Sequence, residues 1–350
     1  MPDIRIGIDT SKLPSSRGED RGVHEVLETA AAIGCTGVLF RSVLELDPGL
    51  DHGAIAEVRA HADELDLYIE AGIAKVNPYM TAELPEIRAL GDGDYLRALE
   101  RMVAACAAAG VTELWTATAA WKRRYPGIFQ YDRFRTDAPW HDQLAAIERL
   151  LLALRPTLLR HGVHLNVETH EEITSFEVIR LVEAVGPDVL GVTFDIANVV
   201  VRGEDPVAAA QRCRQYLRMC HLRDLALWPT PTGFDRYVAP FGSGVVDWDR
   251  VFPVLAGSPL RMWTIEGLEP GGQRSRKPVD VRDQRWLDGH PDLVDAELHG
   301  LAALAAQYAD VAARGVADGV EELDRPGDPM AFLTSGLAFL GARSESEVAA

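Results

Sequence analysis

Four β-like segments of the chain each end in a side chain of a type that binds metal ions. They read HLNVETH, GVTFDIAN, LRMCHLRD and RMWTIEG, and the side chains are Glu168, Asp195, His221 and Glu266. Side chains alternate between the two faces of a strand, so each ligand should share a face with the residue two positions before it. The apolar Phe194, Leu222 and Ile265 should face the opposite way. One acidic strand end would be weak evidence, but four in the same relation to their strands predict a common site.

Three carboxylates and one imidazole form a hard, oxygen-rich ligand set. Such a set favours one divalent ion, Mn²⁺ first and Mg²⁺ or Co²⁺ as alternatives, whereas a structural zinc site prefers thiolates. Four protein ligands leave two positions of an octahedral ion for a carbonyl and the adjacent hydroxyl of a sugar-like substrate. Chelation there would acidify the neighbouring C–H. Each residue alone also fits an ion pair, a helix cap or a core histidine, but the four together favour the metal site.

Strand-like segments alternate with helical patterns along most of the chain. The strand candidates are residues 4–10, 37–42, 68–73, 114–119, 164–169, 191–198, 217–224 and 262–267. The helix candidates that follow them are residues 23–33, 52–65, 95–109, 142–160, 175–185, 206–216, 248–255 and 295–312. This alternation implies right-handed crossovers and a parallel sheet. Eight strands, with no GxGxxG turn after any of them, favour a closed (β/α)8 TIM barrel over a doubly wound sheet.

The barrel hypothesis sets the expected domain organisation. Residues 1–313 form the barrel, which the helix 295–312 closes, and residues 314–350 form a C-terminal helical extension with a helix candidate at 329–340 and a polar tail. The loop 121–140 is rich in aromatic residues and arginines and is expected to be a lid or a substrate wall. Two further segments, 229–244 and 270–291, are interpreted as a Pro/Gly-rich insertion and an irregular connection.

Composition excludes several classes of function. Lys and Arg number 35 against 53 Asp and Glu, which gives a net charge of −18 and argues against binding to nucleic acid. The N-terminal residues show neither a basic region nor an apolar core of a signal peptide, and no apolar run is long enough to span a bilayer. We therefore expect no membrane association and a cytoplasmic location. Four cysteines without CxxC spacing are expected to be reduced core residues.

Other polar residues near the predicted strand ends are candidates for roles around the metal. His170 shares a face with Glu168 and could act as a general base. Asn198 could hold a ligand or a substrate hydroxyl, or simply cap a helix. The basic candidates for binding substrate are Arg41, Lys122, Arg223 and Arg274. For Arg223 the simpler expectation is an ion pair with Asp224 at the rim.

These motifs resemble a known family. The order VETH, FDIAN followed by GEDP, CHLRD, FGSGVVDW and TIEG is similar to the sugar phosphate isomerase/epimerase family of the xylose-isomerase-like TIM barrel superfamily, over roughly residues 4–312. The resemblance implies that Glu168, Asp195, His221 and Glu266 bind one divalent metal, and that the two glutamates move the substrate proton on opposite faces of a ketose. Related three-metal endonucleases need further histidines. Asn198 stands where one of these would follow Asp195, so DNA repair is excluded.

The leading functional hypothesis is an isomerase or epimerase that abstracts a proton next to a carbonyl of a sugar or polyol-derived ketone, through an enediolate held by the metal. The alternative is a metal-dependent lyase on the same scaffold. It would be an inosose or dehydroshikimate-type dehydratase, or the barrel subunit of a C-glycoside deglycosidase that acts on 3-oxo-glycosides. The expected partner is a small carbohydrate. A homo-oligomer, or a small partner subunit in the deglycosidase case, stays open, as do the substrate and its phosphorylation.

Overall fold

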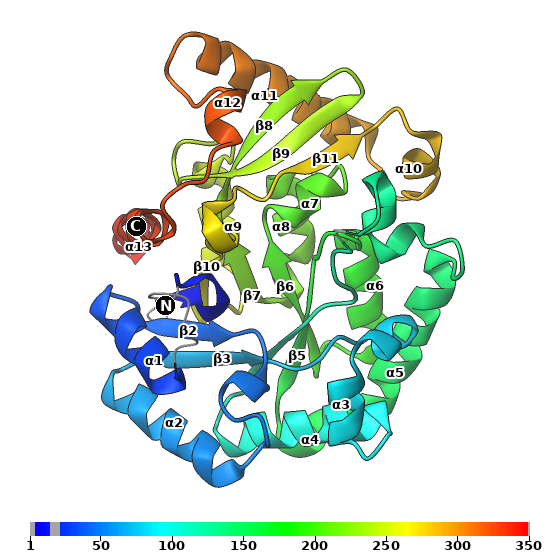
Figure 1. The fold of residues 1–350 in the computed structure, drawn as a ribbon, viewed down its shortest axis with the longest axis vertical. Coiled ribbons are helices and arrows are strands. Elements are labelled where there is room, and N and C mark those ends of the chain that lie inside the picture. Colours follow the sequence, from blue (N-terminus) through cyan, green and yellow to red (C-terminus); the bar gives the residue numbers. More distant parts are fainter. Residues whose placement is uncertain (1–3, 15–21, 123, 349–350) are drawn as a thin grey trace.

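The computed structural model describes residues 4–14, 22–122 and 124–348 (Figure 1). Its centre is a closed barrel of parallel strands that neighbour one another in chain order. The barrel strands are β1 (Arg5–Asp9), β2 (Gly37–Phe40), β3 (Tyr68–Gly72), β4 (Glu113–Thr116), β5 (His164–Glu168), β6 (Leu190–Asp195), β7 (Leu217–Leu222) and β10 (Met262–Ile265). The predicted TIM barrel is confirmed.

Helices surround the barrel and cover its apolar outer face. They are α1 (Val23–Ala32), α2 (His52–Glu64), α3 (Pro85–Leu90), α4 (Tyr95–Ala108), α5 (Trp140–His161), α6 (Ser175–Val185), α7 (Asn198–Val201), α8 (Pro206–Cys213) and α9 (Trp248–Ala256). Several begin at a side chain that accepts a hydrogen bond from the first turn, as Asp94 does for α4 and Thr174 for α6. Such caps satisfy amide groups that the helix itself leaves without partners.

The strand residues divide between the two faces of the barrel wall as the alternation predicts. Phe194, Leu222 and Ile265 belong to the large core between barrel and helices. A separate apolar cluster fills the barrel interior and consists of Leu39, Trp115, Ala117, Met219 and Met262. Glycine is required on two neighbouring strands of this interior. A Cβ atom on Gly7 or Gly37 would lie 2.4 Å from the sulfur of Met262. The barrel is thus filled below the level of the ligands.

A small second sheet lies beyond the barrel, where the sequence suggests only an insertion and an irregular connection (Figure 1). It is antiparallel, in the order β11–β9–β8, and its strands are β8 (Asp224–Thr230), β9 (Gly233–Ala239) and β11 (Lys277–Asp280). The prediction of irregular structure is wrong for these segments. Pro229 and Pro278 lie in the two edge strands, where a missing amide hydrogen costs little, so neither proline prevents the sheet from forming.

The two long helices near the C-terminus do not pack as predicted, because the later helix and not the earlier one packs against the barrel. Helix α11 (Asp295–Ala313) packs against β8 and β9, whereas α13 (Pro329–Val348) packs against β1 and β10 and closes the ring of barrel helices. Leu333 and Leu340 of α13 are fully buried. Two short helices, α10 (Gln284–Asp288) and α12 (Val320–Leu323), lie in the connections. The prediction that residues 295–312 close the barrel is wrong, and the domain boundary at residue 313 stays a prediction.

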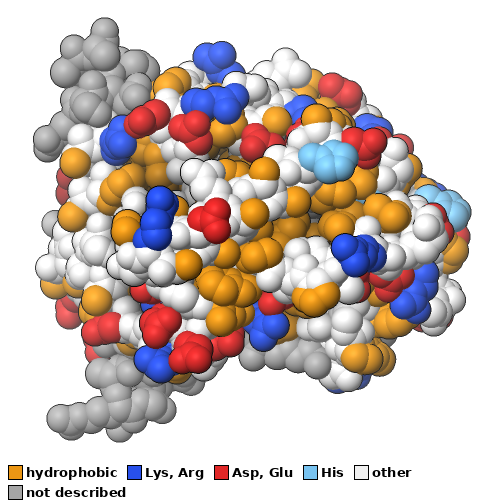
Figure 2. All heavy atoms as spheres, turned by 90° about the horizontal axis from the view of Figure 1, so that it is seen from above, with side chains coloured by type: hydrophobic (Ala, Val, Ile, Leu, Met, Phe, Trp, Pro, Cys, Tyr) orange, Lys and Arg blue, Asp and Glu red, His pale blue; other side chains and the backbone are white. Residues whose placement is uncertain are grey.

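The surface and the helices give two further observations. On the face seen from above α11, acidic and basic side chains are interspersed, with hydrophobic side chains between them (Figure 2). The negative net charge is therefore not gathered into one patch on that face. Within the described residues, no helix combines the length and the apolar character needed to cross a bilayer.

Candidate active site

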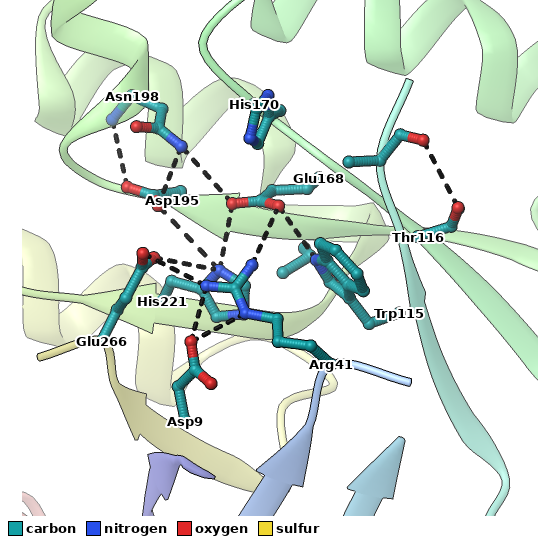
Figure 3. A network of polar contacts seen from close by, with 12 residues as sticks. Asp9, Arg41, Trp115, Thr116, Glu168, His170, Asp195, Asn198, His221 and Glu266 are labelled. Atoms are coloured by element: carbon teal, nitrogen blue, oxygen red, sulfur yellow. Dashed lines mark hydrogen bonds and ion pairs between the residues drawn. The ribbon is translucent and has the colours of Figure 1, made fainter. Parts of the chain in front are cut away.

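The predicted ligands meet at the C-terminal end of the barrel. Glu168 and Asp195 are the last residues of β5 and β6, His221 lies near the end of β7, and Glu266 directly follows β10. Each contributes one oxygen or nitrogen atom, and these atoms all lie within 4.8 Å of one another (Figure 3). We call these residues the ligand cluster. Adjacent parallel strands in register bring them together, because Asp195 pairs with His221, and His221 pairs with Thr264.

The imidazole of His221 is the centre of the ligand cluster. Its Nδ1 lies 3.1 Å from Oε1 of Glu168, 3.6 Å from Oε2 of Glu266 and 3.9 Å from Oδ2 of Asp195. All of these residues are at least nine-tenths buried. Buried carboxylates this close together repel one another, so the arrangement favours a bound cation.

Hydrogen bonds hold most oxygens of the cluster carboxylates and leave one oxygen without a partner. Glu168 Oε2 accepts from the indole Nε1 of Trp115 at 3.0 Å, and Asp195 Oδ1 accepts from the backbone amides of Ala197 and Asn198 at 2.8 and 3.0 Å. The buried Oε2 of Glu266 has no hydrogen-bond partner. A buried acceptor without a partner costs free energy that a cation would recover. The donor set and this open oxygen therefore fit a hard divalent ion.

The electrostatics differ among the three carboxylates. Burial raises the pKa of Asp195, against the effect of the Arg223 guanidinium, and the negative charges of Glu266 and Glu168 raise it further. Burial also opposes ionisation of Glu168 and Glu266, but their neighbours lower both pKa values overall, chiefly the His221 imidazole for Glu168 and the Arg223 guanidinium for Glu266. The surroundings thus favour the ionised forms of Glu168 and Glu266, whereas burial opposes a third negative charge on Asp195.

Two predicted substrate-binding arginines reach the ligand cluster. The Arg41 guanidinium lies 2.7 Å from Asp9, 3.2 Å from Glu266 and 3.6 Å from Glu168. Arg223 lies 2.6 Å from Asp195 and 3.1 Å from Glu266. Both can therefore donate to negative charge that develops on a substrate oxygen.

The simpler expectation for Arg223, a rim ion pair with Asp224, is wrong. The Asp224 carboxylate instead accepts from backbone amides at 2.8–3.2 Å and from the indole Nε1 of Trp248 at 3.0 Å. It therefore fixes the chain where β7 leads into β8, and it leaves Arg223 to the ligand cluster.

His170 and Asn198 also lie beside the ligand cluster. The Nδ2 atom of Asn198 lies 2.9 Å from Asp195 Oδ2 and 3.4 Å from Glu168 Oε1, so Asn198 orients the ligands from the start of α7. His170 Nδ1 contacts the Glu172 carboxylate. Burial opposes the protonation of His170, but this carboxylate raises its pKa overall.

A cavity of about 270 Å³ opens above the ligand cluster, and we call it the inner cavity. Its lining includes the predicted Arg41, His170, Asn198 and Arg223 together with Glu168 and Glu266. Of its other lining residues, Trp121 begins the loop that was predicted to be a substrate wall, whereas sequence reasoning did not identify Lys12, Glu171, Glu269 and Lys277 as site residues. Lys12 lies just beyond β1, so the strand-end rule used for Arg41 could have found it.

Lys277 comes from the second sheet, outside the barrel. Its Nζ lies 2.9 Å from Glu171 and 3.1 Å from the centre of the Trp121 ring. Arg236, its register partner on β9, lies 3.2 Å from the same glutamate. The second sheet thus contributes a wall of the inner cavity, and Trp121 from the predicted lid loop belongs to that wall.

The structure does not bring two predicted substrate ligands to the inner cavity. The Lys122 ammonium lies 2.6 Å from the buried carboxylate of Asp132, and Lys122 lines a separate cavity beside Tyr125. Arg274 lies 2.7 Å from Asp318 and lines another cavity. Both cations follow strand candidates in sequence, but each extends to an acidic partner elsewhere.

The comparisons with known proteins agree with this architecture. The chain belongs to the xylose isomerase-like TIM barrel family, whose model matches residues 27–288. This confirms the resemblance found in the sequence. A solved structure of an L-ribulose 3-epimerase superposes with a TM-score of 0.59 at 17% identity, and the match covers 99% of this chain and 98% of the epimerase. At that identity the likeness shows the shared fold.

Two curated relatives are enzymes, as the sequence predicts for this chain. A 3-oxo-isoapionate decarboxylase of Pectobacterium atrosepticum is 26% identical over 125 residues, which is 34% of this chain and 43% of the relative. An inosose dehydratase of Bacillus cereus is 24% identical over 110 residues, 27% of this chain and 36% of the relative. The chain thus spans less than half the length of these relatives.

Proposed function

We propose that the chain is a divalent-metal-dependent isomerase or epimerase that abstracts a proton next to the carbonyl of a sugar or polyol-derived ketone. The observation that carries this proposal is the convergence of three carboxylates and one imidazole, within 4.8 Å, beneath a polar cavity at the C-terminal end of the barrel. Glu168, Asp195, His221 and Glu266 would hold the ion, with Mn²⁺ as the first choice and Mg²⁺ or Co²⁺ as alternatives.

The bound ion would supply a Lewis acid that polarises the carbonyl and stabilises negative charge on its oxygen. Glu168 and Glu266 come from β5 and β10, which β6 and β7 separate in the barrel wall, so their carboxylates approach a substrate from two sides. One glutamate takes the proton, and the C–H electron pair becomes the double bond of an enediolate. The other glutamate first takes up a proton from water and then delivers it to the opposite face of the same carbon, which gives the epimer. Delivery to the former carbonyl carbon, with transfer of the hydroxyl proton of the first carbon to the former carbonyl oxygen, gives the isomer.

Two arginines and Asn198 would bind the substrate and position the carboxylates. Arg223 and Arg41 lie beside the carboxylates that hold the ion and would donate to the enediolate oxygens. Asn198, which already contacts two ligands, would keep their carboxylates in place or bind a hydroxyl. The proposed partner is therefore a small carbohydrate.

A lyase on the same scaffold is the second candidate. The names of the two curated relatives, a dehydratase and a decarboxylase, favour it. An enediolate with a leaving group on the next carbon can expel that group instead of regaining a proton, as inosose-type dehydration or cleavage of a 3-oxo-glycoside requires. His170, which lines the inner cavity and contacts Glu172, would then protonate the leaving oxygen. The deglycosidase case would add a small partner subunit.

The decisive experiment combines metal content with hydrogen exchange. We expect about one divalent ion per chain, lost in Asp195→Ala, and deuterium from D₂O next to the carbonyl of a ketose or a 3-oxo-glucoside. In Glu168→Gln and Glu266→Gln, exchange should fall at least a hundredfold while the fold is kept. The product then distinguishes the two activities, because a lyase releases a leaving group whereas an isomerase or epimerase does not. Failure of the wild type to bind any divalent ion after reconstitution would refute the proposal.

A further inference from the structure

A second cavity adjoins the inner cavity and is about twice its size. It encloses about 560 Å³, whereas the inner cavity encloses about 270 Å³. Lys12 and Glu269 line both, and their side chains form an ion pair of 3.0 Å between the two spaces. We call the second space the outer cavity. Because both cavities share these two lining residues, a ligand bound at the ligand cluster could extend past this ion pair into the outer cavity.

The volumes indicate what the two spaces can hold. Protein sites for drug-sized ligands enclose roughly 300–1,000 Å³. The inner cavity falls just below this range and suits a single sugar, whereas the outer cavity lies well within it. A free monosaccharide at the ligand cluster would therefore leave the larger space without a ligand.

The lining of the inner cavity is also more polar than that of the outer cavity. The inner cavity is lined mostly by charged side chains, with the indole of Trp121 at one wall. The outer cavity has a mixed lining. Its apolar residues are Leu13, Pro14, Val26, Leu268, Pro270 and Pro329, and its polar residues are Thr10, Ser11, Lys12, Glu45 and Glu269. None of the described residues that line it is aromatic, although sugars commonly stack on aromatic rings. The outer cavity therefore suits a largely apolar group, whose polar substituents could meet Ser11 or Glu45, better than a second sugar.

We propose that the outer cavity binds an apolar aglycone and that the substrate is an oxo-glycoside rather than a free ketose. This inference rests on the proposed function, because it assumes that the reacting sugar lies over the ligand cluster. An aglycone attached at the carbonyl carbon of a ketose would turn that carbonyl into a ketal and block proton abstraction. A substrate that fills both cavities must therefore carry its carbonyl at another ring carbon, as a 3-oxo-glucoside does.

The test compares ligands that differ only in the aglycone. The metal-loaded enzyme is titrated calorimetrically with methyl and phenyl β-D-glucoside, which lack the carbonyl and cannot react. We expect the phenyl glucoside to bind at least tenfold more tightly. Deuterium exchange is measured in parallel with methyl and phenyl 3-oxo-β-D-glucoside, and the ratio of kcat/KM values should favour the phenyl compound by a similar factor.

Variants locate the effect in the outer cavity. Val26→Trp narrows this cavity from α1, and Leu13→Trp does so from the segment after β1, so one remains if the other fails to fold. Each should bring the affinity ratio of phenyl to methyl glucoside close to one. The control is Thr136→Trp, an equally large substitution beside the separate cavity of Tyr125, which should leave the ratio unchanged.

Two different results would decide the two proposals. Affinities for the two glucosides that agree within twofold, or a preference that both outer-cavity variants retain, would overturn the aglycone subsite. Absence of exchange from every ketose and oxo-glucoside would overturn the proposed function, whereas the affinity ratio would still decide the subsite.

Discussion

Trp115 connects the ligand cluster to the cations around it. Its indole donates to the outer oxygen of Glu168, and its ring lies beneath the Arg41 guanidinium and the Lys75 ammonium, 4.8 and 4.4 Å from its centre. The hydrogen bond turns the other oxygen of Glu168 toward His221. Partners of this kind commonly change metal affinity or activity ten- to a hundredfold when they are removed.

Trp115→Phe should therefore lower kcat about tenfold and weaken metal binding, with a smaller change in KM. The ring stays, so the contacts with the two cations are largely kept. The control is Trp263→Phe, because the buried Nε1 of Trp263 has no hydrogen-bond partner. We expect Trp263→Phe to lower the stability of the fold and to leave kcat and metal binding unchanged. Equal effects of both substitutions on kcat, at equal metal content, would show that the Trp115 hydrogen bond does not contribute.

Lys277 should bind a substrate oxygen from the wall that the second sheet contributes to the inner cavity. Its ammonium is buried between Glu171 and Trp121, and an ammonium has three donors, so it can serve a ligand as well. Lys277→Met should raise KM about tenfold and leave kcat within about threefold, while Lys277→Arg keeps most of the affinity. Arg276→Met is the matched control, since Arg276 pairs with Asp235 and does not line the inner cavity.

The same lysine gives a pH dependence. Burial lowers the pKa of Lys277 to about 8, against the effect of the Glu171 carboxylate. The ammonium is present below that pH and is lost above it, so KM should rise as the pH increases through about 8. Lys277→Arg should abolish this rise, because a guanidinium stays protonated there. A rise that persists in Lys277→Arg would assign the titration to another group.

Among the elements, α13 decides whether the C-terminal region is an appendage or part of the barrel. It packs against β1 and β10, and a Cβ atom on Gly336 would lie 3.0 Å from the Ile265 side chain, so helix and strand approach closely. Without α13 the apolar outer face of two barrel strands would be exposed. The helix is therefore expected to be required for folding.

Leu333→Ala in α13 should lower the free energy of unfolding by about 2–5 kcal/mol, because Leu333 is fully buried. Leu159→Ala provides the matched control, since Leu159 lies in α5 and is 51% exposed, and its substitution should cost less than about 1 kcal/mol. Chemical denaturation of both variants measures the difference. Similar small losses would indicate that α13 is dispensable.

The sequence predicted the barrel and the convergence of the four candidate ligands, because both depend on local patterns. Alternation along each strand places Asp195 and His221 on the inner face, and parallel strands in register then bring them together. Side-chain pairing is not local. Lys122 and Arg274 follow strand candidates, as Arg41 does. They pair instead with Asp132 and Asp318, and no sequence pattern predicts these partners.

The second sheet and the closing helix escaped prediction for related physical reasons. Lys277 lies in a four-residue edge strand, KPVD, within the segment that was interpreted as irregular, and an edge strand tolerates its proline. Helices α11 and α13 both carry apolar faces, and chain order favoured the earlier one as the barrel helix. Packing against β8 and β9 decides the role of α11, and β9 lies within the segment that was interpreted as an insertion.

At the scale of the whole molecule, metal and fold should stabilise each other. The ligand cluster draws on β5, β6, β7 and β10, which are half of the barrel wall, so an ion that binds only the folded chain would link strands far apart in sequence. Ion at a hundred times its dissociation constant would add about 2.7 kcal/mol to the free energy of unfolding. The melting temperature should therefore rise by several degrees between chelator and Mn²⁺.

A chain with a net charge of −18 can also bind divalent ions weakly over its surface, so the location of this effect needs a control. Asp195→Asn should abolish the Mn²⁺-dependent rise in melting temperature, because it removes a ligand charge. Glu113→Gln should keep the rise, since Glu113 is an equally buried carboxylate that pairs with Arg218 at 2.6 Å, outside the ligand cluster. Differential scanning calorimetry with Mn²⁺ or chelator measures both. If Asp195→Asn kept the full rise, the ion would act at the surface and not at the ligand cluster.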